Sequence, residues 1–201
     1  MKAVQDLGPP LTQAGYRVFW SVVYHADGRK KSDELAVLRT IDRYEIVRLR
    51  QTNGANYGQS NADIVSRLEQ WEALCEFEII GAAIDWVAME FVSLPRHICS
   101  FAEEVYTFCP DSVEQGVGLM RERDHPEAFA AARQLCPKLS AAMEMRLAQQ
   151  KQRFEAMTPR MPPQLLAMLR SSEAISTPTD TGIRLLAYEI NKNRSLFLWW
   201  D

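Results

Sequence analysis

The sequence contains little proline and glycine and no long apolar run, and each shortage excludes a class of protein. Its 201 residues include 9 Gly and 10 Pro, which excludes a collagen-like or low-complexity chain. The longest apolar stretch, from Ile79 to Ile84, stops at Asp85 and is far shorter than the roughly 20 residues that cross a bilayer. The first residues, MKAVQDLGPP, lack the apolar stretch of a signal peptide. We therefore expect a cytoplasmic protein without a membrane partner.

The chain is also poor in residues that bind metals or attack substrates. It has three scattered histidines, none in an HExxH or HxH pattern, and four cysteines without a CxxC motif or a zinc-finger spacing. The sequence predicts no metal site and no cofactor, and it predicts free thiols at all four cysteines, which are Cys75, Cys99, Cys109 and Cys136.

Charge is slightly negative overall and unevenly distributed. The formal net charge is -3, which argues against a dedicated nucleic-acid-binding protein. Residues 119–176 carry 9 Lys and Arg against 6 Asp and Glu, so the rest of the chain is distinctly acidic. This acidic part could face a basic partner, or its charge could simply keep the surface soluble.

Hydrophobic patterning predicts a mixture of strands and helices in the first half of the chain. Aromatic and β-branched residues favour strands, whereas apolar residues three and four positions apart favour helices. A capping box of Ser60 and Asp63 marks the start of the clearest helix. The expected strands are residues 16–25, 44–51, 76–84 and 85–94, the last two as a hairpin, and the expected helices are residues 33–40, 59–76 and 95–109.

The second half is different, because residues 119–176 are rich in Ala, Met, Gln and Arg and contain no strand-like run. They predict three helices, over 125–136, 137–157 and 162–172, separated by prolines. A helix capped by Asp180 or Thr181 and a closing strand, Ser195 to Trp200, follow. An apolar stripe in this region would form a helix-packing core or a partner-binding face; it consists of Met143, Leu147, Phe154 and Met157.

These elements predict an α+β fold with a mainly antiparallel sheet flanked by helices. We expect residues 1–118 and 177–201 to form one α+β domain, and residues 119–176 to form a helical insertion.

Three motifs together resemble one known family. They are NYGQSNADI (residues 56–64), FCPDSVEQG (residues 108–116) and the terminal LFLWWD (residues 196–201). Their order is similar to that of the bacterial domain-of-unknown-function family 4253, in which an NYG segment, a CPD segment followed by QG, and a terminal WWD recur. The resemblance covers roughly residues 44–118 and 181–201, and the helical residues 119–176 depart from it.

This resemblance implies an α+β fold and a cytoplasmic bacterial protein, and it brings no established catalytic residues. Some small domains of this kind occur among immunity proteins of bacterial toxin systems, which is an analogy.

Cys109 and Asp111 place a nucleophile next to a carboxylate. His97, on the same expected helix, lies about 18 Å away at 1.5 Å per residue, too far for a thiolate–imidazole hydrogen bond. A structural interpretation is simpler: Pro110 ends the helix, and Asp111 caps a short turn with Glu114 at its third position.

The other two motifs have similar alternatives. Asn56 and Tyr57 precede a helix N-terminus that could receive an anion, or the segment forms a tight turn with Tyr57 packed on the sheet. Alternation sends Trp199 and Trp200 to opposite faces of the last strand, and Asp201 adds two carboxylates. These residues either cap the structure or contact a partner.

The candidate binding residues are therefore Asn56, Tyr57, Asp111, Glu114, Trp199, Trp200 and Asp201, and no residue is predicted to be catalytic. The favoured hypothesis is a non-enzymatic interaction protein, an immunity protein that binds and neutralises a toxin effector. The alternatives are an enzyme or small-ligand-binding domain with a pocket near Tyr57, Cys109, Asp111 and the terminal WWD, and an assembly protein that dimerises through residues 119–176.

Overall fold

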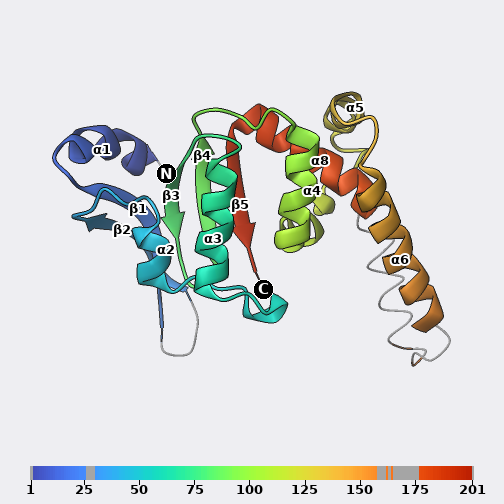
Figure 1. Ribbon diagram of the computed structural model, residues 1–201, viewed down its shortest axis with the longest axis horizontal. Coiled ribbons are helices and arrows are strands. Elements are labelled where there is room, and N and C mark those ends of the chain that lie inside the picture. The colour runs from blue at the N-terminus through green and yellow to red at the C-terminus, as the bar shows by residue number, and fades with distance from the viewer. Residues whose placement is uncertain (1, 26–29, 158–161, 163, 165–176, 201) are drawn as a thin grey trace. The chain divides into compact units, whose positions relative to one another are not determined.

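The computed structural model describes residues 2–25, 30–157, 162, 164 and 177–200 (Figure 1). The chain divides into two compact units. Unit 1 comprises residues 1–96 and 194–201, and unit 2 comprises residues 97–193. The fold is α+β, as the sequence predicts. The predicted division, with residues 119–176 as an insertion, stays a prediction.

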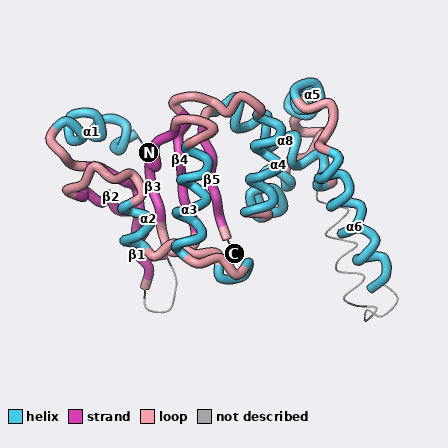
Figure 2. Tube along the Cα trace, viewed as in Figure 1, coloured by secondary structure: helices cyan, strands magenta, loops and turns pink. Residues whose placement is uncertain are grey.

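Unit 1 is built on one five-stranded sheet with the strand order β2-β1-β3-β4-β5. Figure 2 shows these strands side by side. All neighbouring pairs are antiparallel except β1 and β3, which are parallel. The strands are β1 (Arg17–Tyr24), β2 (Lys30–Leu38), β3 (Phe77–Ala82), β4 (Trp86–Phe91) and β5 (Ser195–Trp199). The predicted hairpin and the predicted C-terminal strand are thus both present.

Helices cover both faces of this sheet. On one face α1 (Lys2–Gln13) places Val4 in a core cluster with Val18 and Val22 of β1 and Trp86 of β4. The other face is covered by α2 (Glu45–Arg50) and α3 (Asn61–Glu72), as Figure 1 shows. The α3 residues that pack there, including Trp71, are fully buried. The sequence analysis did not predict α1, which contains two prolines.

Two predicted elements were wrong. Residues 33–40 were expected to be a helix, but they continue β2 to Leu38, where a long register with β1 overrides their local helix propensity. Residues 44–51 were expected to be a strand, but they form α2. Ile46 and Val47 are both completely buried. A helix can place these neighbours against one core, whereas a strand would send them to opposite faces.

Unit 2 is helical. Its α-helices are α4 (Ile98–Phe108), α5 (Pro126–Leu135), α6 (Ala141–Met157) and α8 (Thr179–Asn193). The buried apolar face of α8 packs against both α4 and α5. The predicted helices over 95–109, 125–136 and 137–157 are confirmed, whereas the one over 162–172 lies outside the described residues. Because α8 begins at Thr179, the predicted cap residues Asp180 and Thr181 lie inside its first turn.

A disulfide in unit 2 corrects the prediction of four free thiols. Cys99 of α4 is bonded to Cys136, which follows α5, across 37 positions in the sequence. The two residues meet because α4 and α5 both pack against α8 in the folded unit, so no local motif marks the pair. Cys75 and Cys109 keep their thiols, and both are buried.

This assignment predicts a thiol count. Burial raises the pKa of Cys75 to about 11, so its thiol stays protonated and unreactive at pH 8. We expect iodoacetamide at pH 8 to label no cysteine in the native chain, two in the unfolded chain, and four only after reduction. Mass spectrometry of the labelled protein measures this count, and four labelled cysteines without reductant would contradict the disulfide.

Glu103 of α4 forms a second link between distant parts of unit 2, through hydrogen bonds to Ser140. Its carboxylate accepts hydrogen bonds from the backbone nitrogen and the hydroxyl of Ser140, at 2.7 and 2.5 Å. The Ser140 hydroxyl in turn accepts from the backbone N–H of Met143 in the first turn of α6. A buried charge is tolerated here because it satisfies donors at a helix start.

None of the described helices is long and apolar enough to cross a membrane.

Candidate functional site

The first motif continues a loop that begins at Thr52 and is hydrogen-bonded to one end of the sheet in unit 1. The Thr52 hydroxyl donates to the carbonyl oxygen of Ala83 at 2.6 Å, and the Asn53 N–H donates to that of Ile84 at 2.8 Å. The carbonyl acceptors belong to the turn between β3 and β4. The loop continues as a short 3-10 helix, Ala55–Tyr57, and Gly58 follows it with φ at 68°, a left-handed conformation that suits glycine.

The terminal motif lies against the same loop. The backbone N–H of Trp200 donates to the Asp85 carbonyl at 2.9 Å, and its buried indole covers Gly54. A Cβ atom added to Gly54 would lie 2.8 Å from Cδ1 of Trp200, so no larger residue fits without displacing the indole. Three segments that are far apart in the sequence are therefore parts of one structure, which we call the motif platform: residues 52–60, 83–85 and 199–200.

The helix after the loop starts as the sequence predicts. Ser60 and Asp63 form a capping box, in which the Ser60 N–H donates to the Asp63 carboxylate at 2.8 Å and the Asp63 N–H donates to the Ser60 hydroxyl at 3.3 Å. Hydrogen bonds from Ser60 lower the pKa of Asp63. Asn61 then donates to the carbonyls of Val47 and Thr52. These polar residues of the motif hold the backbone in place.

Other residues of the motif platform face outward. Asn56 is exposed, Tyr57 is 40% exposed and Ile84 is 53% exposed. The expectation that Tyr57 packs on the sheet stays a prediction, because its side chain is 40% exposed and so still partly covered. Ile84 was not predicted as a site residue, and its exposed apolar side chain at a turn is the signal that could have identified it.

The two terminal tryptophans have different environments, as their alternation predicts. Trp200 is buried against Gly54, whereas Trp199 is only partly buried and packs against the core cluster of Val18, Trp86 and Ala88. Asp201 lies outside the described residues.

The second motif lies in unit 2 and turns the chain after α4. Cys109 and Asp111 are both buried. Asp111 makes no capping hydrogen bond to the backbone, contrary to the prediction; its carboxylate instead accepts from the Gln115 side-chain amide at 3.1 Å. His97 and Cys109 flank opposite ends of α4. This geometry agrees with the separation expected from the sequence.

Residues Ser112–Gly116 form one turn of π-helix, a conformation that is frequent at functional sites. It is fixed by close packing around Val113. A Cβ atom on Gly118 would lie 2.5 Å from the Val113 carbonyl oxygen, and one on Gly182 of α8 would lie 2.5 Å from Cγ1 of Val113. The turn directs the side chain of Glu114 toward α4 and α6.

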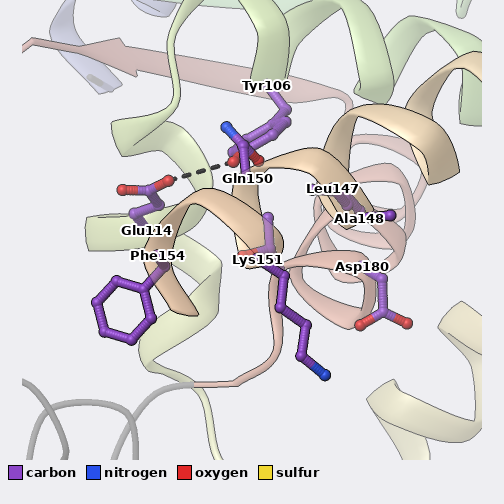
Figure 3. Close-up of a pocket in the computed structure, with 9 residues that line it drawn as sticks. Tyr106, Glu114, Leu147, Ala148, Gln150, Lys151, Phe154 and Asp180 are labelled. Carbon is purple, nitrogen blue, oxygen red and sulfur yellow. Dashed lines mark hydrogen bonds between the residues drawn. The ribbon is translucent and has the colours of Figure 1, made fainter. Parts of the chain in front are cut away.

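Glu114 lines an open cavity of about 680 Å³ (Figure 3). The Tyr106 hydroxyl donates a hydrogen bond of 3.2 Å to the Glu114 carboxylate. Partial burial of the carboxyl group raises the pKa of Glu114; the hydrogen bond from Tyr106 opposes this, and the charge of Asp111 adds to it. Burial, followed by the nearby charge of Glu114, also raises the pKa of Tyr106.

The rest of the cavity wall comes from α6 and the start of α8. It combines apolar, amide, basic and acidic side chains, and its other residues are Leu147, Ala148, Gln150, Lys151, Phe154, Thr179 and Asp180. Neither Cys109 nor Asp111 lines it. Within the predicted apolar stripe Met143 is buried and Met157 is exposed, whereas Leu147 and Phe154 face this cavity. The spacing of 147, 151 and 154 on one helical face is the sequence signal for the wall.

The raised pKa of Glu114 predicts how stability depends on pH. Because the folded state holds this proton more firmly than the unfolded chain, the stabilisation is complete below the ordinary glutamate pKa and is lost as pH rises through the raised value. This loss is absent in Glu114→Gln, so we expect the stability of the variant to rise relative to that of the wild type between pH 4 and pH 7. Urea unfolding at several pH values measures it.

The matched control is Glu122→Gln, also in unit 2. A hydrogen bond with Arg133 lowers the pKa of Glu122, so this variant should lose stability relative to wild type as pH rises. A loss of stability with rising pH in both variants would show that the pKa of Glu114 is not raised.

The sequence model of one family matches residues 34–201, and the chain therefore belongs to the family described as domain of unknown function (DUF4253). The match confirms the resemblance drawn from the three motifs. No curated protein and no solved structure matches the chain.

Proposed function

We propose that this protein is a non-enzymatic interaction protein, specifically a cytoplasmic bacterial immunity protein that binds and neutralises a toxin effector through the motif platform. The observation that carries the proposal is that some residues of this platform bind the sheet while others are exposed to solvent. Its inward groups fasten the loop to the sheet, while Asn56, Tyr57 and Ile84 face solvent. A rigid surface with an exposed aromatic and an exposed aliphatic side chain suits tight protein binding, because little entropy is lost on association.

The acidic character of the chain outside residues 119–176 contributes little to this proposal, because the acidic excess is small in each of the two units. Unit 1 contains 12 Lys and Arg against 14 Asp and Glu, and unit 2 contains 11 against 12. Both units are therefore close to neutral. Several unit 1 charges also pair with each other, as Arg17 does with Glu78 and Arg43 with Glu72. The partner is accordingly expected to be recognised mainly by shape and apolar contact.

The proposal is tested by co-expression. Each polypeptide encoded next to this reading frame is expressed in bacteria with the wild-type chain or with the Tyr57→Asp or Ile84→Asp variant, and growth is measured. We expect one neighbour to inhibit growth, the wild-type chain to restore it, and both variants to restore it at least tenfold less well.

The control is Val92→Asp, because Val92 is 54% exposed in the same unit, nearly the same as Ile84, but lies outside the motif platform. It should protect like the wild type. The proposal fails if no neighbouring product inhibits growth, or if the platform variants protect as well as Val92→Asp does.

The disulfide bears on the proposed compartment. Disulfides persist in oxidising compartments and are rare in the cytoplasm, so the Cys99–Cys136 bond makes the proposed cytoplasmic location directly testable. The thiol count of protein trapped rapidly from its native host decides: four free thiols support the cytoplasm, and two support an oxidising compartment.

One observation favours a second function, which is small-ligand binding. The cavity beside Glu114 unites a protonatable carboxyl group, a hydroxyl, an amide and a lysine with apolar walls, a combination typical of ligand sites. Lys151→Ala and Phe154→Ala should each abolish binding of any small molecule found by a thermal-shift screen. If both variants keep the shift, the ligand binds elsewhere.

A further inference from the structure

The two edge strands of the sheet in unit 1 differ in how well they are protected against pairing with another chain. Edge β2 contains Asp33 and Glu34, and its register with β1 is broken between Val23 and Tyr24. Charges and bulges of this kind prevent edge-to-edge association. Edge β5 has the sequence SLFLW and pairs with β4 without a register shift. No charge, proline or bulge occurs within Ser195–Trp199, all of which the structure describes.

The register shows which backbone groups of β5 point outward. Trp200 donates to the Asp85 carbonyl, and the Arg194 carbonyl accepts from Phe91. In an antiparallel pair the hydrogen-bonded residues alternate, so Arg194, Leu196, Leu198 and Trp200 direct their N–H and C=O groups toward β4. The N–H and C=O groups of Ser195, Phe197 and Trp199 therefore point away from β4, along the outer edge.

From this edge we infer that two copies of the chain associate through β5, which pairs antiparallel with β5 of the second copy across a twofold axis at Phe197. This register places Phe197 opposite Phe197, and Ser195 opposite Trp199 of the second copy. All three outward-directed residues then become hydrogen-bonded pairs. The outward N–H and C=O groups of β5 are complementary to the same groups of a second β5 that runs in the opposite direction. A twofold interface requires this, because both copies use the same surface.

Side chains on one face of the sheet support the same register. The Trp20 and Trp86 rings lie 4.5 Å apart, and the Phe197 ring stacks on Trp86 at 5.4 Å with an interplanar angle of 27°. This row of aromatic rings runs across the sheet and ends at Phe197, which is 46% exposed. In the dimer a second Phe197 continues the row, and such cross-strand aromatic pairs are stabilising. On the other face, Leu196 and Leu198 would meet their counterparts.

Five residues of strand edge bury little area, so the dimer should be weak, with a dissociation constant in the micromolar range. Sedimentation velocity of the full chain from about 1 to 300 µM measures it. We expect Phe197→Lys to weaken the dimer at least tenfold, because it opposes two ammonium groups at the axis. Val37→Lys is the matched control, since Val37 is 51% exposed on the opposite edge strand, and it should dimerise like the wild type.

A second variant keeps the test decisive if Phe197→Lys does not fold. In Phe197→Cys the two introduced thiols would face each other across the axis, at a Cα separation of about 5.5 Å that permits a disulfide. Glutathione disulfide should convert this variant to a covalent dimer, and Val37→Cys should stay monomeric. A wild-type chain that is monomeric at 300 µM overturns the inference. So does a dimer that is insensitive to Phe197→Lys, or one that is lost in Val37→Lys.

Discussion

Replacing both Cys99 and Cys136 by serine is expected to lower the free energy of unfolding of unit 2 by about 4 kcal/mol. The bond closes a loop of 37 positions, and a cross-link of this length removes about that much conformational freedom from the unfolded chain. It joins the start of α4 to the end of α5, so it spans much of unit 2. Urea unfolding monitored by circular dichroism measures the change.

The control is treatment with a reductant, because Cys75 and Cys109 are present as free thiols in both proteins. Wild-type protein treated with dithiothreitol should approach the stability of the double serine variant, while the variant itself should not respond to the reductant. A wild-type protein whose unfolding is unchanged by reduction would show that the bond contributes nothing. Each unit should be followed with its own probe, since the two units need not unfold together.

Trp200→Ala is expected to destabilise unit 1 by about 3–5 kcal/mol, the usual cost of removing a buried tryptophan. Trp200 is only 3% exposed and lies on Gly54, so its loss opens a cavity beneath the motif loop. Hydrogen exchange should show increased exchange in residues 52–60, beyond the drop in overall stability. Phe197→Ala, which truncates an aromatic residue that is 46% exposed, serves as the control and should cost far less.

A double-mutant cycle tests the contact directly. Gly54→Ala alone should cost about 1–3 kcal/mol, because its methyl group would overlap the Trp200 indole. In the Trp200→Ala background the same methyl group meets the cavity, so the penalty should disappear or change sign. Strictly additive effects would mean that the two motifs do not depend on each other.

Much of the fold was predictable where local pattern and tertiary structure agree. The capping box at Ser60 and the aromatic and β-branched residues of β4 specify their elements through neighbouring residues alone. The exchange of helix and strand in residues 33–51 has the opposite origin. There β2 is decided by its pairing with β1, and α2 by the burial of adjacent Ile46 and Val47. A window of ten residues contains neither the strand that pairs with β2 nor the core that buries α2.

The candidate sites were predictable only in part for the same reason. Motif recognition found Tyr57 and Glu114, but the contact of Gly54 with Trp200 joins residues 146 positions apart. The disulfide and the α6 wall of the Glu114 cavity likewise depend on how helices pack. A motif indicates that a segment has a fixed role, whereas the packed structure shows which of its side chains are left to meet other molecules.

The chain leaves unit 1 after Arg96 and returns only at Arg194, which has a consequence for synthesis on the ribosome. At about 5–20 residues per second, roughly 5 to 20 seconds pass between completion of β4 and arrival of β5. During this interval β4 is the edge strand of the nascent sheet, and its outer N–H and C=O groups have no strand to pair with. Gly54 is also not yet covered by the indole of Trp200. The sheet of unit 1 is therefore completed by residues 195–200 only after all of unit 2 has been synthesised.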